Sequence, residues 1–416
     1  MHKRNIILLF IIGLIFLLGG CALLSGQNGS NQQLEEEDQQ SQLNDYVRTQ
    51  INAMSIEEKI GQLVIAGVDG YENDLQAQTL IEEYKIGGII LFKRNIKDLN
   101  QMLELINSLK ESNSVNPIPL FLAIDEEGGR VSRLPDEFLK TPASQKIGEI
   151  NDSELSFRLA SIVGQQLKAC GLNMNFAPVL DVNSNPNNPV IGDRSFSHDP
   201  DQVCTQGIQT MNGLRSQDII SVVKHFPGHG DTLVDSHLGL PVVDHDINRL
   251  YSLELIPFAC AIENKAEAIM TAHILLPNID PHNPASFSSN TISKILRQDL
   301  GFDGLVITDD LTMAAVIDNY DIQEAAVQAI KAGSDQVLVC HDFQKEKAVL
   351  QALKQAVENG DISVERLEQS LFRILKLKME YNLTDEPVST VNYQALNQKL
   401  EALYKDYQDL SYLLKP

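Results

Sequence analysis

Eight short apolar runs, separated by amphipathic segments, constrain the fold of this chain most strongly. Each run has the length of a strand and is almost wholly apolar, as expected for parallel strands covered on both faces. The intervening segments repeat apolar residues at intervals of three and four, as at Met102, Leu105 and Leu109, which is typical of helices. The predicted strands are Leu63–Ala66, Gly88–Phe92, Leu120–Ile124, Leu172–Ala177, Ile219–Val223, Ala268–Ala272, Leu305–Thr308 and Gln336–Cys340.

Eight strands that alternate with helices predict an α/β fold, a single (β/α)8 TIM-type barrel. A doubly wound open sheet would give a similar pattern. Polar residues directly after the strands favour the barrel, because closure gathers the strand ends around one mouth, where barrel enzymes place their chemistry. These residues are Asp125, Asn183, Lys224, His273, Asp309 and His341.

The N-terminus has the pattern of a targeting segment. A positive end at His2–Arg4 precedes the apolar run Ile6–Leu18, and Gly19-Gly20-Cys21 ends it. This resembles a bacterial lipoprotein signal, which predicts a signal peptide over residues 1–20 and lipidation of Cys21. The protein is then expected to be exported and lipid-anchored on the outer face of the bacterial cytoplasmic membrane. An uncleaved anchor is the alternative.

The rest of the chain divides by composition. Residues 21–42 are polar and lack aromatic residues, which predicts a disordered tether. Residues 43–382 hold the predicted barrel, closed by a helix from Ser363 to about Tyr381. Residues 383–416 form a C-terminal extension, expected to be an extended segment followed by an amphipathic helix.

Charge and cysteine content restrict the function further. The formal net charge of −23 argues against nucleic acid as a partner and against charge-driven binding to anionic lipid. Four cysteines are scattered beyond Cys21, and we interpret them as buried thiols and not as a disulfide framework or a metal site. They are Cys170, Cys204, Cys260 and Cys340.

The segment from Lys224 to His237 is the richest in chemistry. It holds a lysine, three histidines and two aspartates, while Pro227, Gly228 and Gly230 exclude a helix, so it predicts a functional loop. Asp235 stands two residues before His237, where its carboxylate could bond one ring nitrogen and leave the other as a general acid or base.

A metal site is the alternative for this segment. His225 and His229 have ligand-like spacing, but the helix that this spacing needs is excluded, and the glutamate of a His-Glu-x-x-His motif is missing. We therefore expect no metal.

Three further candidates follow other strands. Asp125 is suited to bind sugar hydroxyls, unless its Asp-Glu-Glu-Gly-Gly-Arg segment is an acidic turn with an internal ion pair. Arg194 lies in a long loop, either as a ligand clamp or in a surface ion pair. Asp309 ends the seventh strand and suits a nucleophile, whereas Asp310 beside it is expected to be structural.

These motifs together resemble glycoside hydrolase family 3, and within it the bacterial β-N-acetylhexosaminidases. The resemblance runs from about Leu43 to Tyr381 and rests on Asp-Glu-Glu-Gly-Gly-Arg, Gly-Asp-Arg-Ser-Phe, Lys-His-Phe-Pro-Gly-His-Gly-Asp-Thr, Asp-Ser-His and Thr-Asp-Asp-Leu-Thr-Met. It implies a retaining mechanism without a cofactor, with Asp309 as nucleophile and His237, oriented by Asp235, as acid/base. It further implies sugar contacts by Asp125, Arg133, Arg194, Lys224 and His225, with Arg130 structural.

The resemblance also restricts the substrate. It implies release of terminal GlcNAc from GlcNAc-containing oligosaccharides, either muropeptides and other peptidoglycan fragments or chito-oligosaccharides. The chain has no Trp, which disfavours a long polysaccharide cleft and favours a small pocket. The open alternatives are a phosphorylase of the same family, a surface lipoprotein that binds sugar without catalysis, and a metal-dependent hydrolase.

Overall fold

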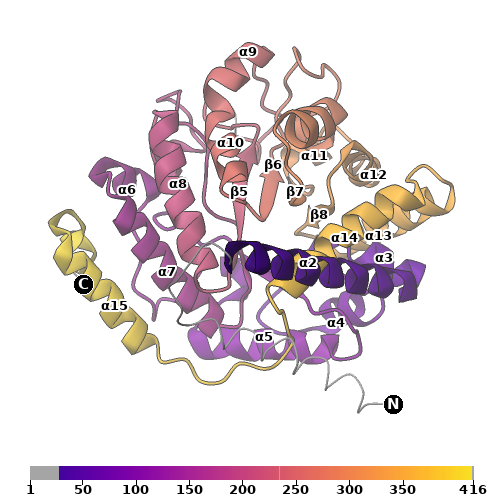
Figure 1. Cartoon of the computed structure of the whole chain (residues 1–416), viewed down its shortest axis with the longest axis horizontal. Coiled ribbons are helices and arrows are strands. Elements are labelled where there is room, and N and C mark those ends of the chain that lie inside the picture. Colours follow the sequence, from indigo (N-terminus) through magenta and orange to yellow (C-terminus); the bar gives the residue numbers. More distant parts are fainter. Residues whose placement is uncertain (1–27, 234, 415–416) are drawn as a thin grey trace. The chain divides into compact units, whose positions relative to one another are not determined.

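The structure is a computed structural model that describes residues 28–233 and 235–414 (Figure 1). The predicted signal peptide and Cys21 lie outside the described residues. The chain divides into two compact units, Met1–Arg48 and Thr49–Pro416. The second unit contains the whole barrel and its surrounding helices.

Within the described residues, eight parallel strands form a closed barrel in which each strand pairs with the next and β8 pairs with β1. The prediction of a (β/α)8 barrel is therefore confirmed. Side chains of the strands are buried almost throughout, because helices cover the outside and opposing strands fill the inside. The strands are β1 (Val64–Ala66), β2 (Gly88–Leu91), β3 (Phe121–Ile124), β4 (Met174–Asn175), β5 (Ile220–Phe226), β6 (Ala268–Thr271), β7 (Leu305–Asp310) and β8 (Gln336–Val339).

The helices surround the barrel (Figure 1) and begin where the sequence offers capping side chains. Asp98, Asp152, Asp321 and Ser363 each accept a main-chain N–H from the first turn of the helix that follows. The larger helices are α4 (Leu75–Glu82), α5 (Leu99–Asn113), α6 (Ser144–Ile150), α7 (Ser153–Ala169), α8 (Pro200–Arg215), α10 (Ile256–Glu263), η5 (Asn290–Asp299), α12 (Ile322–Ala332), α13 (Phe343–Glu358) and α14 (Val364–Glu380). Shorter elements are α3 (Ile56–Gly61), α9 (Ile247–Arg249) and α11 (Ala314–Ile317).

Three strands differ from the prediction by two residues or more in length, and these differences affect the site. β4 is shorter than predicted and has only Met174 and Asn175, because the chain soon meets Pro178, which lacks a donor for the ladder. β5 and β7 are longer, so that Lys224, His225 and Asp309 lie within the strands and not after them. A place on a strand holds a side chain more rigidly than a place on a loop.

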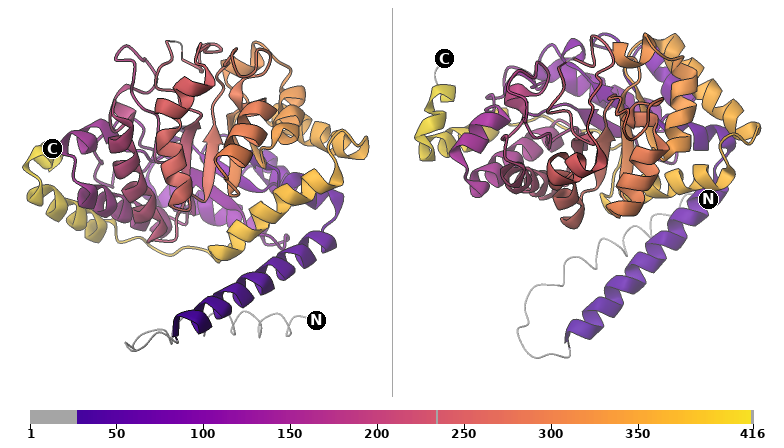
Figure 2. Two further views of the ribbon diagram at one scale, coloured as in Figure 1. Left: turned by 45° about the horizontal axis from the view of Figure 1, so that its top comes forward. Right: turned by 90° about the horizontal axis from the view of Figure 1, so that it is seen from above.

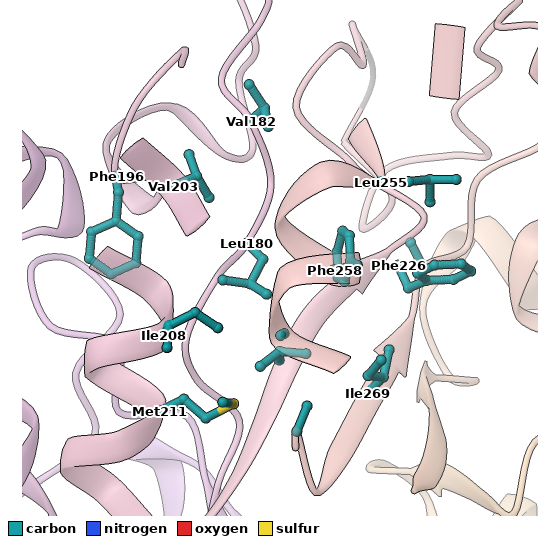
Figure 3. Packing of buried hydrophobic residues seen from close by; sticks show 14 of the residues in the cluster. Leu180, Val182, Phe196, Val203, Ile208, Met211, Phe226, Leu255, Phe258 and Ile269 are labelled. Atoms are coloured by element: carbon teal, nitrogen blue, oxygen red, sulfur yellow. The ribbon is translucent and has the colours of Figure 1, made fainter. Parts of the chain in front are cut away.

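The hydrophobic core on one side of the barrel lies between the strands and the helices that cover them (Figure 3). Phe226 of β5 meets Phe258 of α10 edge to face, with ring centroids 5.3 Å apart. Leu180, Val203 and Met211 continue this core toward α8. The packing fixes β5, and therefore the functional residues at its end.

The C-terminal extension packs along the barrel and ends in α15 (Tyr393–Asp406) and the short helix η6 (Gln408–Leu414). The segment between α14 and α15 runs along the outside of the barrel (Figure 2) and is held by two hydrogen bonds between Asn107 and Val388. Tyr404 of α15 is fully buried, and its hydroxyl donates to the carbonyl oxygen of Lys140. The expected extended segment and helix are both present.

Two sequence-based expectations differ from the structure. Residues 28–42 of the predicted disordered tether form the first part of helix α2 (Asn28–Ala53), a segment rich in Gln and Glu, which favour helices. Cys204 and Cys260, predicted as free thiols, form a disulfide, because α8 and α10 pack side by side and bring their Cα atoms to 6.0 Å. Cys170 and Cys340 are buried free thiols as predicted. No helix of the described chain has the length and apolar character needed to cross a bilayer.

Candidate active site

A buried lysine lies at the centre of the site. The Lys224 side chain is 3% exposed, and its ammonium lies 2.6 Å from a carboxylate oxygen of Asp125 and 2.6 Å from one of Glu127. Burial lowers the pKa of Lys224, but the two carboxylates outweigh this effect and raise it above its ordinary value. Lys224 is therefore a permanent cation, and Asp125, directly after β3, is fixed beside it.

Arg194 extends this charged network to His225. Its guanidinium makes two hydrogen bonds of 2.8 Å to Glu127 and lies 3.3 Å from Nε2 of His225. On the other side of the ring, Nδ1 of His225 lies 2.6 Å from the Asp181 carboxylate. The Arg194 and Lys224 cations hold the pKa of Glu127 far below its usual range despite burial. The structure thus brings together four of the predicted sugar-binding residues: Asp125, Arg194, Lys224 and His225.

The fifth predicted sugar-binding residue, Arg133, is held differently. It is partly buried on the loop after β3, and its main-chain N–H donates to the buried Glu126 carboxylate at 2.7 Å. Arg130 on the same loop bonds Asp193 and the carbonyl oxygens of Val190 and Ile191, so it joins two loops of the barrel mouth. This contact agrees with the structural role expected for Arg130.

Asp309 lies at the end of β7 and is partly buried. Burial raises the pKa of its carboxyl, but the surrounding imidazoles, of which His225 has the largest effect, and the Asp310 amide lower it below its ordinary value. The Asp310 N–H donates to Oδ1 of Asp309 at 2.8 Å. Asp309 is consequently an ionised carboxylate in a fixed orientation, as a nucleophile requires.

His237 lies on an exposed part of the loop after β5. The neighbouring Ser236 carbonyl accepts the amide of Ala315, which attaches the loop to the segment after β7. His237 is close enough to Asp309 for its charge to lower the pKa of that carboxyl. The Asp235 carboxylate accepts the main-chain N–H of His237 at 2.9 Å, in place of the predicted bond to a ring nitrogen. Residues two positions apart readily form such a turn.

His229 anchors the same loop from within. It is 1% exposed, with Nδ1 at 2.7 Å from the Thr232 hydroxyl and Nε2 at 3.3 Å from the Ser236 hydroxyl. Its main-chain N–H donates to Asp181. Burial and the nearby His225 lower the pKa of His229 to about 4, so its ring is neutral at neutral pH.

Four residues that the structure places in or beside the site had no role predicted from the sequence. Asp181 and Glu127 are the buried anions that hold His225 and Arg194, while His229 and His273 fix the loop after β5 and the end of β7. The position of His273 directly after a strand was the one sequence signal for it. Asp181 has no such signal, because its role depends on a partner 44 residues away.

The arrangement is suited to bind a small polyhydroxylated ligand. Fixed carboxylates, a lysine and an arginine offer hydrogen bonds to hydroxyl groups, next to an ionised carboxylate and an exposed imidazole. Among residues 28–233 and 235–414, no group of three or more His, Cys, Asp or Glu side chains is arranged to hold a metal ion.

A parallel barrel whose charged groups gather at the carboxyl ends of its strands has the architecture of barrel enzymes. The family described as "Glycosyl hydrolase family 3 N terminal domain" matches residues 55–377. The chain therefore belongs to glycoside hydrolase family 3, and the resemblance seen in its motifs is confirmed.

Named relatives agree with this assignment. Beta-hexosaminidase A of Pseudoalteromonas piscicida is 37% identical over 337 residues, which cover 75% of this chain and 56% of that relative. The beta-hexosaminidase of Nitrosomonas eutropha is 36% identical over 324 residues, which cover 76% of this chain and 91% of that relative. The solved glycoside hydrolase family 3 beta-N-acetylglucosaminidase from Paenibacillus sp. str. FPU-7 superimposes with a TM-score of 0.80 at 41% identity, over 85% of this chain and 68% of that structure.

Proposed function

We propose that the protein is a retaining exo-β-N-acetylglucosaminidase. The observation that carries the proposal is the ionised Asp309 carboxylate at the barrel mouth, within electrostatic range of both His225 and His237. The names of the relatives, beta-hexosaminidase and beta-N-acetylglucosaminidase, support the same reaction on the same class of sugar.

In the proposed first step, Asp309 attacks the anomeric carbon of a terminal GlcNAc. The bond from that carbon to the leaving oxygen breaks, an ester to Asp309 forms, and His237 gives its proton to the leaving oxygen. In the second step, His237 takes a proton from water, the oxygen of that water attacks the same carbon, and the ester bond breaks. Asp235 holds the main chain of His237 throughout.

The charged network binds the sugar in this proposal. Asp125 and Lys224 form hydrogen bonds with hydroxyl groups of the sugar. Arg194 and His225 add hydrogen-bond donors near its N-acetyl group. Glu127 and Asp181 are bound to Arg194 and His225, so their part is to keep these two side chains in place. Arg133 is the remaining candidate for contact with the substrate.

The test is release of p-nitrophenol from p-nitrophenyl β-N-acetylglucosaminide. The wild-type protein is expected to turn this substrate over, and Asp309→Ala to lose nearly all activity. Activity that survives in Asp309→Ala would remove the mechanism, and substrate binding without turnover by the wild type would identify a sugar-binding protein instead.

The natural substrate is proposed to be a peptidoglycan fragment or a chito-oligosaccharide. A GlcNAc–MurNAc disaccharide and chitobiose, each incubated with and without inorganic phosphate, distinguish the possibilities by product analysis. Free GlcNAc in both conditions is the expected result. A sugar 1-phosphate formed only with phosphate would identify a phosphorylase.

We also propose export and lipid anchoring through Cys21 on the outer face of the cytoplasmic membrane. The signal-like N-terminal residues support this, and the Cys204–Cys260 disulfide fits an oxidising compartment. Expression with radiolabelled palmitate in a bacterial host should label the wild type and not Cys21→Ala. Equal labelling of both would contradict the proposal.

A further inference from the structure

His273 lies two residues after the end of β6 and is completely buried, so it cannot touch a substrate. Its Nε2 lies 3.0 Å from the main-chain carbonyl oxygen of Asp310, and its Nδ1 lies 2.7 Å from the hydroxyl of Ser286. The ring therefore bridges the residue next to Asp309 and a second buried polar group.

The partners of His273 determine its tautomer. A carbonyl oxygen only accepts hydrogen bonds, so Nε2 must carry the hydrogen. Burial lowers the pKa of His273 more than the nearby carboxylates of Asp309 and Asp310 raise it, which keeps the ring neutral. Nδ1 then has no hydrogen and accepts one from the Ser286 hydroxyl.

Ser286 is itself held rigidly against the end of β6. It lies in the short helix η4 (Ala285–Phe287) and is fully buried. Its main-chain N–H donates to the carbonyl oxygen of Ala272, and the N–H of Ala285 donates to that of Ile274, so hydrogen bonds flank His273 on both sides. The imidazole consequently has a fixed support.

Asp310 connects this support to Asp309. Its N–H donates to the Asp309 carboxylate, and its carbonyl oxygen accepts from His273. Its own carboxylate accepts the N–H groups of Thr312 and Cys340, at 2.9 Å and 3.0 Å, and the Thr312 hydroxyl at 2.6 Å. His273 supplies the contact from the β6 side, and Cys340 supplies the one from the β8 side.

We propose that His273, whose ring is held by Ser286, is a positioning residue that orients the Asp309 nucleophile through the main chain of Asp310. The inference rests on the proposed function, because it gives Asp309 the role of nucleophile. His273 exchanges no proton with the substrate in either step.

The experiment compares two substitutions at one position. The Gln side chain ends near the place of Nε2 and can still donate to the Asp310 carbonyl, whereas Asn ends near the place of Nδ1 and cannot. His273→Asn is expected to lower kcat about 100-fold, since a small misplacement of a reacting group has that effect. KM should change less than about threefold, because contacts to the bound sugar are unaltered, and His273→Gln should recover most of kcat.

A second readout separates this role from acid/base catalysis. The loss in His273→Asn should be the same for good and poor leaving groups, because the nucleophile is needed for both. Ser286→Ala should lower kcat about tenfold by the same route. Ser370→Ala is its matched control, since Ser370 is an equally buried hydroxyl that bonds Asp335, and it should leave kcat unchanged.

The outcomes separate this inference from the proposed function. Wild-type protein and Asp309→Asn are assayed in parallel, and an inactive wild type would count against the function itself. With an active wild type, equal kcat in His273→Asn and wild type would overturn the positioning role, as would equal losses in the Gln and Asn variants. If His273→Asn fails to fold, Ser286→Ala decides: normal kcat in that folded variant overturns the inference.

Discussion

At the scale of single residues, the site depends on buried charges that neutralise one another. Lys224 is held between Asp125 and Glu127, and Glu127 also binds Arg194. Ionised groups with so little exposure are stable only in pairs, because an unpaired buried charge is costly. Each member of this network therefore serves the fold and the site at once, and removing one leaves its partner uncompensated.

His237 differs, because it is exposed and its ring makes no hydrogen bond to another residue of the described chain. We expect His237→Ala to fold normally and to lose about 100-fold or more in kcat with chitobiose, whose leaving group needs a proton. The loss with p-nitrophenyl β-N-acetylglucosaminide should be much smaller. Steady-state kinetics on both substrates measure the difference, and the exposed His198→Ala serves as control. Equal losses on the two substrates would contradict the acid/base role.

Glu346 on α13 should make stability depend on pH. Burial, together with the carboxylates of Asp69, Asp310 and Asp342, raises its pKa to about 8. The folded protein then holds a proton that the unfolded chain loses above about pH 4.5, so stability falls as pH rises from there to about 8. Glu346→Gln removes this effect and should become more stable than the wild type, by a few kcal/mol at about pH 8.

Calorimetric unfolding from pH 5 to pH 8 tests this prediction. The gap between Glu346→Gln and the wild type should widen steadily with pH. Glu358→Gln on the same helix is the matched control, because Glu358 is exposed and should show no such trend. A constant gap would mean that Glu346 is ionised throughout.

At the scale of elements, the strands determine which side chains reach the mouth. Their apolar composition predicted all eight strands, and the polar residues directly after the strands favoured a closed barrel over an open sheet. The partners were not predictable, because pairs such as Lys224 and Asp125 lie 99 residues apart and meet only after the barrel closes. For the same reason, the role of Asp181 and the disulfide were not predicted; the two cysteines are 56 residues apart.

That disulfide joins α8 to α10 and should stabilise both against unfolding. Replacing Cys204 and Cys260 together with Ala should lower the free energy of unfolding by about 2–4 kcal/mol, since the unfolded chain loses a long closed loop. Thermal unfolding with and without dithiothreitol measures the effect. The reductant should lower the Tm of the wild type and leave the double variant unchanged; an equal response in both would contradict the assignment.

At the scale of the whole barrel unit, the C-terminal extension adds a second layer of packing outside the barrel helices. α15 lies against α7 and contributes Leu400, Leu403 and Tyr404 to the core (Figure 1). The apolar spacing of the sequence predicted this helix but not its position. An amphipathic pattern shows that one face is buried, but not which surface it packs against.

Tyr404 should contribute much of the free energy that holds α15 against the rest of the barrel unit. Tyr404→Ala is expected to destabilise the protein by about 3 kcal/mol through the cavity that it leaves, with kcat unaffected. Tyr412→Ala is the matched control, because Tyr412 is 50% exposed and its loss should change stability by less than about 0.5 kcal/mol. Denaturant titrations measure both, and equal effects would show that α15 is not part of the cooperative fold.

The ion pairs that Lys224 and Arg194 make with buried carboxylates also bear on the salt concentration at which the protein works. Screening by dissolved ions weakens attractions between charges that face the solvent, and it reaches shielded pairs far less. The ammonium and guanidinium groups here are already matched by carboxylates inside the barrel mouth. An uncharged sugar then meets a binding site whose electrostatic character is the same at low and at high salt concentration.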